Sequence, residues 1–133
     1  MFALASSIHH FMAARNIISW VLQVLIGLAF IFSGGNKLLH LTDTVDMFAK
    51  LGMPAFVTYL VAGGELLGGI GLLLPRFVRP AALGLIIIMI GAVFIHATKI
   101  PGGLLPKGLP ALGLLLGLVI ILLLRRPVLA RLA

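Results

Sequence analysis

Glu65 is the residue of this sequence best placed to do chemistry, because it is the one acid within a long apolar stretch, 55–74. It lies about ten residues into the stretch, which in a helix corresponds to about 15 Å and to a depth near the middle of a bilayer. An acid at that depth usually faces a bundle interior or a cavity. Ala62, Gly68 and Gly69 share its helical face, and such small residues let a partner helix approach closely. The pattern predicts either a functional carboxylate or a neutral, hydrogen-bonded Glu65 that joins two helices.

A second polar group ends an earlier apolar stretch. Ser33, Asn36, Lys37 and His40 follow the spacing of one helical face, provided that the helix continues through the two glycines among them. Gln23 extends the same stripe inward at heptad spacing from Lys37. We expect these side chains to form a ligand-binding face with Lys37 as its cation. For Lys37 the alternative is an anchor that snorkels to the membrane interface, and His40 alone fits a simple interface residue.

His96 completes the candidate site from a third apolar stretch. Helical side chains lean toward the N-terminus of their helix. In an antiparallel bundle Lys37 and His96 therefore lean toward the centre of the membrane, while Glu65 leans from the centre toward its outer side. The sequence therefore predicts a Lys37–Glu65 pair with His96 nearby, all three as catalytic candidates. A carboxylate beside an imidazole can exchange protons with a quinone oxygen or a transported amine. We expect no metal, because two ligands are too few, and no haem, because His40 and His96 lie too near the same edge.

The rest of the sequence must position these groups within a membrane. Of its 133 residues, 62% are hydrophobic and 10% charged, whereas soluble domains are nearer one half and one quarter. We expect one domain, 1–133, of class all-α. It is predicted to be a polytopic membrane protein, an antiparallel bundle of four transmembrane helices with a short interfacial helix between the first two. The expected spans are 16–40, 55–74, 81–98 and 109–124, with the interfacial helix at 43–51.

Charge and cysteine content narrow the function further. The chain has no cysteine, which excludes disulfides and thiolate chemistry. Its ten basic residues lie mostly between or after the apolar stretches, where they set membrane topology rather than bind nucleic acid. Six arginines fall on one predicted side of the membrane and four lysines on the other, and the excess predicts that both termini are cytoplasmic. The arginines are Arg15, Arg76, Arg79, Arg125, Arg126 and Arg131, and the lysines are Lys37, Lys50, Lys99 and Lys107.

Several short motifs, in this order and spacing, resemble the DoxX-like family of small bacterial four-helix membrane proteins. The resemblance covers roughly residues 15–98, and its motifs lie at 32–38, 51–54, 64–74 and 79–83, followed by His96. It implies a multi-pass protein of the bacterial inner membrane with Lys37, Glu65 and His96 in the positions described. Family members resemble subunits of, or companions to, redox systems, including the smaller part of a thiosulfate:quinone oxidoreductase. Pro75 stands where the family pattern suggests glycine, and the absence of cysteine removes any thiol-based version of such a role.

Three functions fit these observations, so the sequence leaves open whether the chain is an enzyme. The first is a subunit or companion of a quinone-linked oxidoreductase that binds a small apolar ligand near Glu65. Lys37 would then stabilise an anionic form, Glu65 would exchange protons, and His96 would orient the ligand or shuttle a proton. The second is an accessory or assembly protein without catalysis of its own. The third is a small proton-coupled transporter. The expected partners are the lipid bilayer and either a partner protein or further copies of this chain.

Overall fold

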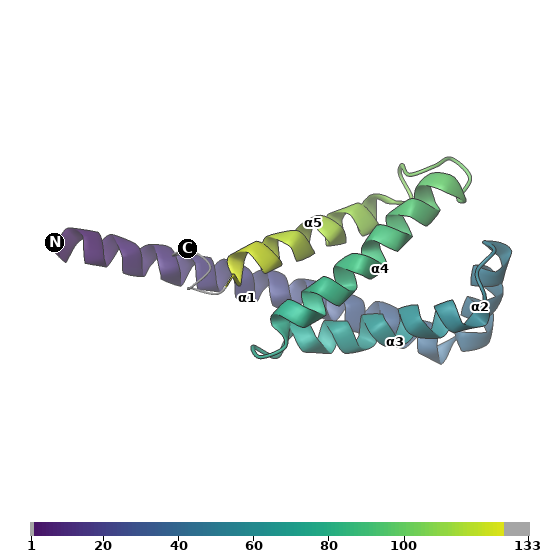
Figure 1. The fold of residues 1–133 in the computed structure, drawn as a ribbon, viewed down its shortest axis with the longest axis horizontal. Helices are drawn as coiled ribbons and strands as arrows, with labels where there is room; N and C mark the ends of the chain where they lie inside the picture. The colour runs from purple at the N-terminus through teal and green to yellow at the C-terminus, as the bar shows by residue number, and fades with distance from the viewer. Residues whose placement is uncertain (1, 127–133) are drawn as a thin grey trace.

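The computed structural model describes residues 2–126, and this part of the chain consists of helices joined by turns and loops (Figure 1). Its five helices are α1 (Phe2–Leu39), α2 (Leu41–Lys50), α3 (Ala55–Leu72), α4 (Val78–Thr98) and α5 (Leu109–Leu124). The prediction of an all-α fold is therefore confirmed over this range. Arg131, which enters the predicted charge balance, lies outside the described residues.

Three of these helices, α1, α3 and α4, are long and apolar enough to cross a membrane. The apolar helix α5 is shorter, with 16 residues. At 1.5 Å per residue α5 is about 24 Å long, somewhat less than the roughly 30 Å of hydrocarbon in a bilayer. Length and composition thus support membrane spanning for three of the four predicted segments.

The first helix begins earlier than the predicted start at residue 16, since α1 is already helical at Phe2. Residues 2–15 contain neither glycine nor proline and include four alanines. The polar His9 and His10 and the charge of Arg15 therefore do not interrupt the helix. Both histidines are exposed. In Figure 1 this N-terminal part of α1 extends well beyond the other helices.

The short helix predicted at 43–51 is present as α2, which begins at Leu41 and ends at Lys50. Gly52 follows with a φ of +84°, a backbone conformation that favours glycine, and reverses the chain toward α3. Pro54 then precedes the first turn of α3, where its fixed φ suits the start of a helix. Thr44 and Phe48 are buried, so α2 packs against the bundle with one side.

The four longer helices pack as a ring in which α1 contacts α3, α3 contacts α4, α4 contacts α5, and α5 contacts α1. Consecutive members of the ring run antiparallel (Figure 1). Large apolar side chains fill its centre, and five of them are almost fully buried: Phe30, Leu72, Leu85, Leu118 and Ile121. Toward the end that carries α2, the pair α4–α5 diverges from α1 and α3 (Figure 1).

The α1–α3 pair approaches most closely, because glycines on both helices leave the backbones exposed to each other. A Cβ atom added to Gly34 would lie 2.7 Å from the carbonyl oxygen of Ala62, and one added to Gly69 would lie 2.7 Å from that of Gly27. Ala62 and Gly69 lie on the face of Glu65, as the spacing of small residues predicts. This close approach brings even short side chains of α1 within reach of α3.

Candidate functional site

Lys37, Ser33 and Glu65 form a closed triangle of polar contacts between α1 and α3. The ammonium of Lys37 donates to Oε2 of Glu65 at 3.0 Å and to the hydroxyl oxygen of Ser33 at 2.7 Å. The Ser33 hydroxyl in turn donates to the same Oε2 at 2.7 Å. One carboxylate oxygen of Glu65 therefore accepts two hydrogen bonds from α1.

Helix continuity through the glycines at 34–35 makes this triangle possible. Because α1 ends only at Leu39, Ser33 and Lys37 lie one turn apart on the same face. Gly34 sits beside them, where any side chain would meet the backbone of α3 at Ala62 and Leu66. Glycine at this position lets the short Ser33 side chain reach Glu65.

The carboxylate is buried, whereas its cation is partly accessible. The exposed fraction of the side chain is 5% for Glu65 and 22% for Lys37. A buried carboxylate needs a cation and hydrogen-bond donors close by, and Lys37 and Ser33 supply both. Oε1 of Glu65 accepts no hydrogen bond from the described residues, so the carboxylate keeps one oxygen available for a ligand or a proton.

The triangle lies on the wall of a cavity of about 790 Å³ between the diverging helices. Most of the lining is apolar and comes from all five helices, including Phe30, Phe48 and Met89. Ser33, Lys37, Glu65 and His96 are among the polar side chains that line it. A largely apolar cavity of this size with a few polar groups has the general character of a small-molecule site.

His96 shares this cavity but makes no hydrogen bond to Glu65 or Lys37. Its Nδ1 lies 2.8 Å from the carbonyl oxygen of Ala92, one turn earlier in α4. A carbonyl oxygen only accepts, so this contact places the hydrogen on Nδ1 and leaves Nε2 as the acceptor. The imidazole can therefore take a proton from a molecule in the cavity at Nε2.

Three of the residues predicted to bind a ligand do not line this cavity. Asn36 and His40 are exposed, and His40 lies between α1 and α2, where its Nδ1 contacts the carbonyl oxygen of Asn36. Gln23 is fully buried near the opposite end of the bundle. It donates to the carbonyl oxygen of Leu72 at 2.8 Å, and its own amide oxygen accepts from Ser19 and Arg125. In the structure these contacts make Gln23 part of the helix packing.

Sequence reasoning missed the contribution of α2 to the cavity. Met47, Phe48 and Leu51 lie on its wall, in and just after a segment that we had expected to rest on the membrane surface. The apolar side of α2 was the available signal, because an apolar face can cover a cavity as well as contact lipid. Lys99 donates to the carbonyl oxygen of Leu51 at 3.1 Å and links this cover to the end of α4.

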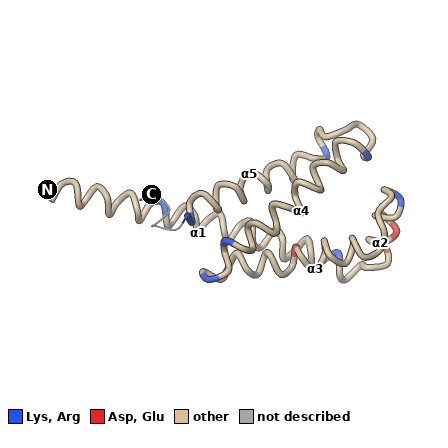
Figure 2. The backbone as a smooth tube through the Cα atoms, viewed as in Figure 1, with Lys and Arg blue, Asp and Glu red and all other residues tan. Residues whose placement is uncertain are grey.

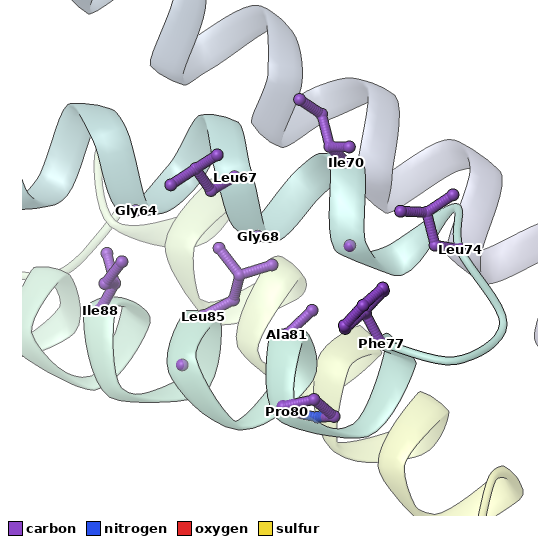
Figure 3. Close-up of a pocket in the computed structure, with 12 residues that line it drawn as sticks. Gly64, Leu67, Gly68, Ile70, Leu74, Phe77, Pro80, Ala81, Leu85 and Ile88 are labelled. Carbon is purple, nitrogen blue, oxygen red and sulfur yellow. The ribbon is translucent and has the colours of Figure 1, made fainter.

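A second hollow, of about 470 Å³, lies between α3 and α4 (Figure 3). Gly64 and Gly68 form its floor on α3, opposite Leu85 and Ile88 of α4 (Figure 3). All of its lining residues are apolar, glycine or proline, so it offers no group for proton transfer. Nowhere in residues 2–126 do three His, Cys, Asp or Glu side chains lie close enough together to hold a metal ion. The Glu65 cavity is thus the candidate site.

Long apolar helices around a cavity that holds a buried, ion-paired carboxylate define a helical membrane protein with an internal polar site. Within that class the chain belongs to the DoxX family, whose family model matches residues 19–98. The matched range contains α2 and α3 and reaches the end of α4, and it includes every residue of the triangle and His96.

A curated relative comes from Bacillus subtilis (strain 168) and carries the name "Putative oxidoreductase CatD". It is 28% identical over 81 residues, which cover 61% of this chain and 60% of that protein. The chain therefore matches less than two thirds of the length of this relative. No solved structure matches the chain significantly.

Proposed function

We propose that this DoxX protein binds a small apolar molecule of the quinone type in the Glu65 cavity, as a subunit or companion of a quinone-linked redox system. The observation that carries the proposal is the combination of a roomy apolar cavity with a buried carboxylate, its ammonium partner and an imidazole on the same wall. The name of the Bacillus relative, which describes an oxidoreductase, supports the redox assignment.

The polar groups have distinct roles in this proposal. When bound, a quinone supplies an acceptor for two electrons and two protons, and the electrons come from a partner redox protein. The ammonium of Lys37 has a third N–H beyond its contacts to Ser33 and Glu65, and it directs this hydrogen at an oxygen of the ligand. Glu65 takes up a proton from the solvent at Oε1, and His96 takes up another at Nε2. Each would pass its proton to the quinone, which balances the two electrons. The apolar walls contribute most of the binding energy, and the polar groups fix the orientation.

The same proposal includes a membrane arrangement. All four long helices, α5 included, span the inner membrane of a bacterium, and α2 lies at the outer interface, where its apolar side lines the cavity. Both termini are cytoplasmic in this arrangement, because Arg76, Arg79 and Arg125 lie at one end of the bundle and Lys50, Lys99 and Lys107 at the other. A partner protein, or a second copy of this chain, contacts the exposed apolar faces.

Extraction of the full chain in a mild detergent, followed by mass spectrometry of the bound small molecules, tests the proposal. We expect a quinone to accompany the wild type and to be lost from Glu65→Gln, which keeps the size of the side chain but removes its charge. Asp46→Asn is the matched control, since Asp46 is exposed on α2 and does not line the cavity. Circular dichroism confirms that each variant remains helical. Retention of the quinone by Glu65→Gln, or its absence from the wild type, would refute the proposal.

An accessory role is the second candidate, and the triangle itself favours it. Ser33 and Lys37 tie α1 to α3 through Glu65, and such a contact stabilises a bundle whether or not a ligand binds. In that case a partner protein would co-purify with both the wild type and Glu65→Gln, and neither preparation would contain a quinone.

A further inference from the structure

Three arginines converge on the C-terminal end of α5, at the end of the bundle opposite the Glu65 cavity. Arg15 of α1 donates from Nη2 to the carbonyl oxygen of Leu123 at 3.0 Å. Arg79 of α4 donates from Nη1 to the carbonyl oxygens of Leu122 at 3.3 Å and Arg125 at 3.2 Å. Arg125 itself follows α5 directly. We refer to Arg15, Arg79 and Arg125 as the arginine cluster.

Neighbouring side chains hold Arg125 in place from α1. Its Nε donates to the amide oxygen of Gln23 at 2.7 Å, and its Nη1 donates to that of Asn16 at 2.8 Å. Its guanidinium also lies 5.5 Å from the ring centre of Trp20, within the range of a cation–π contact. The position of Arg125 is thus fixed before any ligand binds.

Within residues 2–126, no carboxylate neutralises this cluster. The chain has three acids, of which Glu65 pairs with Lys37, while Asp43 and Asp46 lie on α2 at the far end of the bundle (Figure 2). The C-terminal end of a helix offers only about half a negative charge, against three full positive charges here. Burial, and then the nearby positive charge of Arg15, lower the pKa of Arg125 below its usual value. The cluster therefore carries an excess of positive charge that an anion can balance.

The surroundings favour an anion that carries acyl chains. Trp20 lies beside Arg125, and Leu123, whose carbonyl oxygen accepts from Arg15, has an exposed side chain. Tryptophan and arginine beside exposed aliphatic residues are typical of the boundary between headgroups and hydrocarbon. Basic clusters between membrane helices on the cytoplasmic side are known to suit anionic lipid headgroups.

We propose that the arginine cluster binds the phosphate of an anionic phospholipid headgroup. Each guanidinium has five N–H groups, and the contacts of Arg15 and Arg79 occupy one nitrogen each, which leaves donors that match phosphate oxygens in pairs. The site is independent of the redox function proposed above, and it rests on the membrane location and orientation proposed there.

Trp20 is the single tryptophan of the sequence and lies at the cluster, so its fluorescence reports on the lipid bound there. The full chain is reconstituted into vesicles of brominated phosphatidylcholine, which quenches Trp20. Unbrominated phosphatidylglycerol or phosphatidylcholine is then introduced in matched amounts. We expect phosphatidylglycerol to restore the fluorescence at least about fivefold more effectively, given the usual contribution of each basic residue at a membrane surface. Equal recovery with both lipids would overturn the proposal.

Charge variants distinguish lipid binding at the arginine cluster from general attraction to the positive charge at this end of the bundle. Arg79→Gln is expected to lower the preference for phosphatidylglycerol about fivefold, and Arg79→Lys to keep most of it. Arg76→Gln is the matched control, because it removes the same charge from an exposed position outside the cluster. If Arg79→Gln fails to fold, Arg15→Gln gives the same comparison. An equal effect of Arg76→Gln would show general attraction instead of a site and would overturn the proposal.

A soluble phosphate is the other source of the same chemistry. Millimolar inorganic phosphate is added to the vesicles, with sodium chloride of equal ionic strength as the control for screening. We expect the two salts to affect the lipid preference equally. Loss of the preference with phosphate alone would assign the cluster to a soluble phosphate compound and would overturn the lipid assignment.

Discussion

Gly34 lies where α1 and α3 come closest, and its replacement by alanine tests whether this approach builds the site. A Cβ atom at Gly34 would lie 2.5 Å from the backbone nitrogen of Leu66 and 2.7 Å from the carbonyl oxygen of Ala62. Ordinary contacts of a Cβ atom begin at 3.4 Å, so the two helices must separate by about 0.9 Å, the difference from 2.5 Å. Both obstacles are backbone atoms, which cannot rotate out of the way.

This separation has a direct consequence for the triangle. The contact from Ser33 to Glu65 would lengthen from 2.7 Å to about 3.6 Å, which is no longer a hydrogen bond. The longer side chain of Lys37 can follow the carboxylate, but the short side chain of Ser33 cannot. Overpacking of this kind costs about 1–3 kcal/mol. We therefore expect Gly34→Ala to weaken both the fold and ligand retention.

Gly35→Ala is the matched control, because a Cβ atom at Gly35 would meet nothing within 4 Å. Both variants gain the same preference of alanine for helix, about 1 kcal/mol, so their difference isolates the packing cost. Thermal unfolding in one detergent, followed by circular dichroism, should show Gly34→Ala less stable than Gly35→Ala by about 1–3 kcal/mol. If the two variants unfold at the same temperature, α1 and α3 do not meet at Gly34 and the reasoning fails.

Further predictions concern single polar groups, each measured by unfolding in the same detergent. Lys37→Met should destabilise the chain, because it leaves Glu65 without its cation. A double variant with Glu65→Gln should recover part of the loss, with a coupling free energy of about 0.5–3 kcal/mol between the two substitutions, and strict additivity would contradict the ion pair. Gln23→Leu should lower the stability of the fold by about 1–3 kcal/mol, because its buried partners lose their hydrogen bonds, but it should not release the ligand. Loss of the ligand without loss of stability would show that Gln23 binds the ligand. The Thr58 hydroxyl is buried without a hydrogen-bond partner among the described residues, so Thr58→Val should keep or raise stability by about 1 kcal/mol, and a clear loss would reveal a partner.

The sequence was informative about the Glu65 cavity because charge is so rare in its helices. Glu65 and Lys37 each stand out against an apolar background, and helical spacing places Ser33 on the same face as Lys37. The structure brings these three together, and His96 reaches the same cavity. Spacing and topology were sufficient here because all four residues lie in long, regular helices.

The same reasoning was less successful where depth or partners matter. Heptad spacing put Gln23 on the Lys37 face, but 14 residues of helix place it about 21 Å farther along α1. Its contact with Arg125 joins residues that are 102 positions apart, and no local pattern reports such a pair. The helix α1 also begins before the predicted span of 16–40, because a histidine pair and one arginine do not interrupt a helix in the absence of glycine and proline.

The placement of polar groups along α1 and α3 also bears on which helices can move. Between membrane helices the hydrophobic effect contributes little, so close packing and hydrogen bonds decide which pairs stay together. The α1–α3 pair has both: glycine contacts between the backbones, the Glu65 triangle near one end, and the bond from Gln23 to Leu72 near the other. Hydrogen bonds at two separate positions along the helix axes fix how α1 is rotated and how far it is shifted relative to α3. The α4–α5 pair is attached differently, because the side-chain hydrogen bonds that join α5 and Arg125 to α1 lie at the arginine end, away from the cavity. A ligand that enters the cavity should therefore displace α4–α5 together with His96, pivoting at the arginine end and stretching the Lys99 contact to Leu51. The α1–α3 pair, which carries Ser33, Lys37 and Glu65, would remain as the fixed wall.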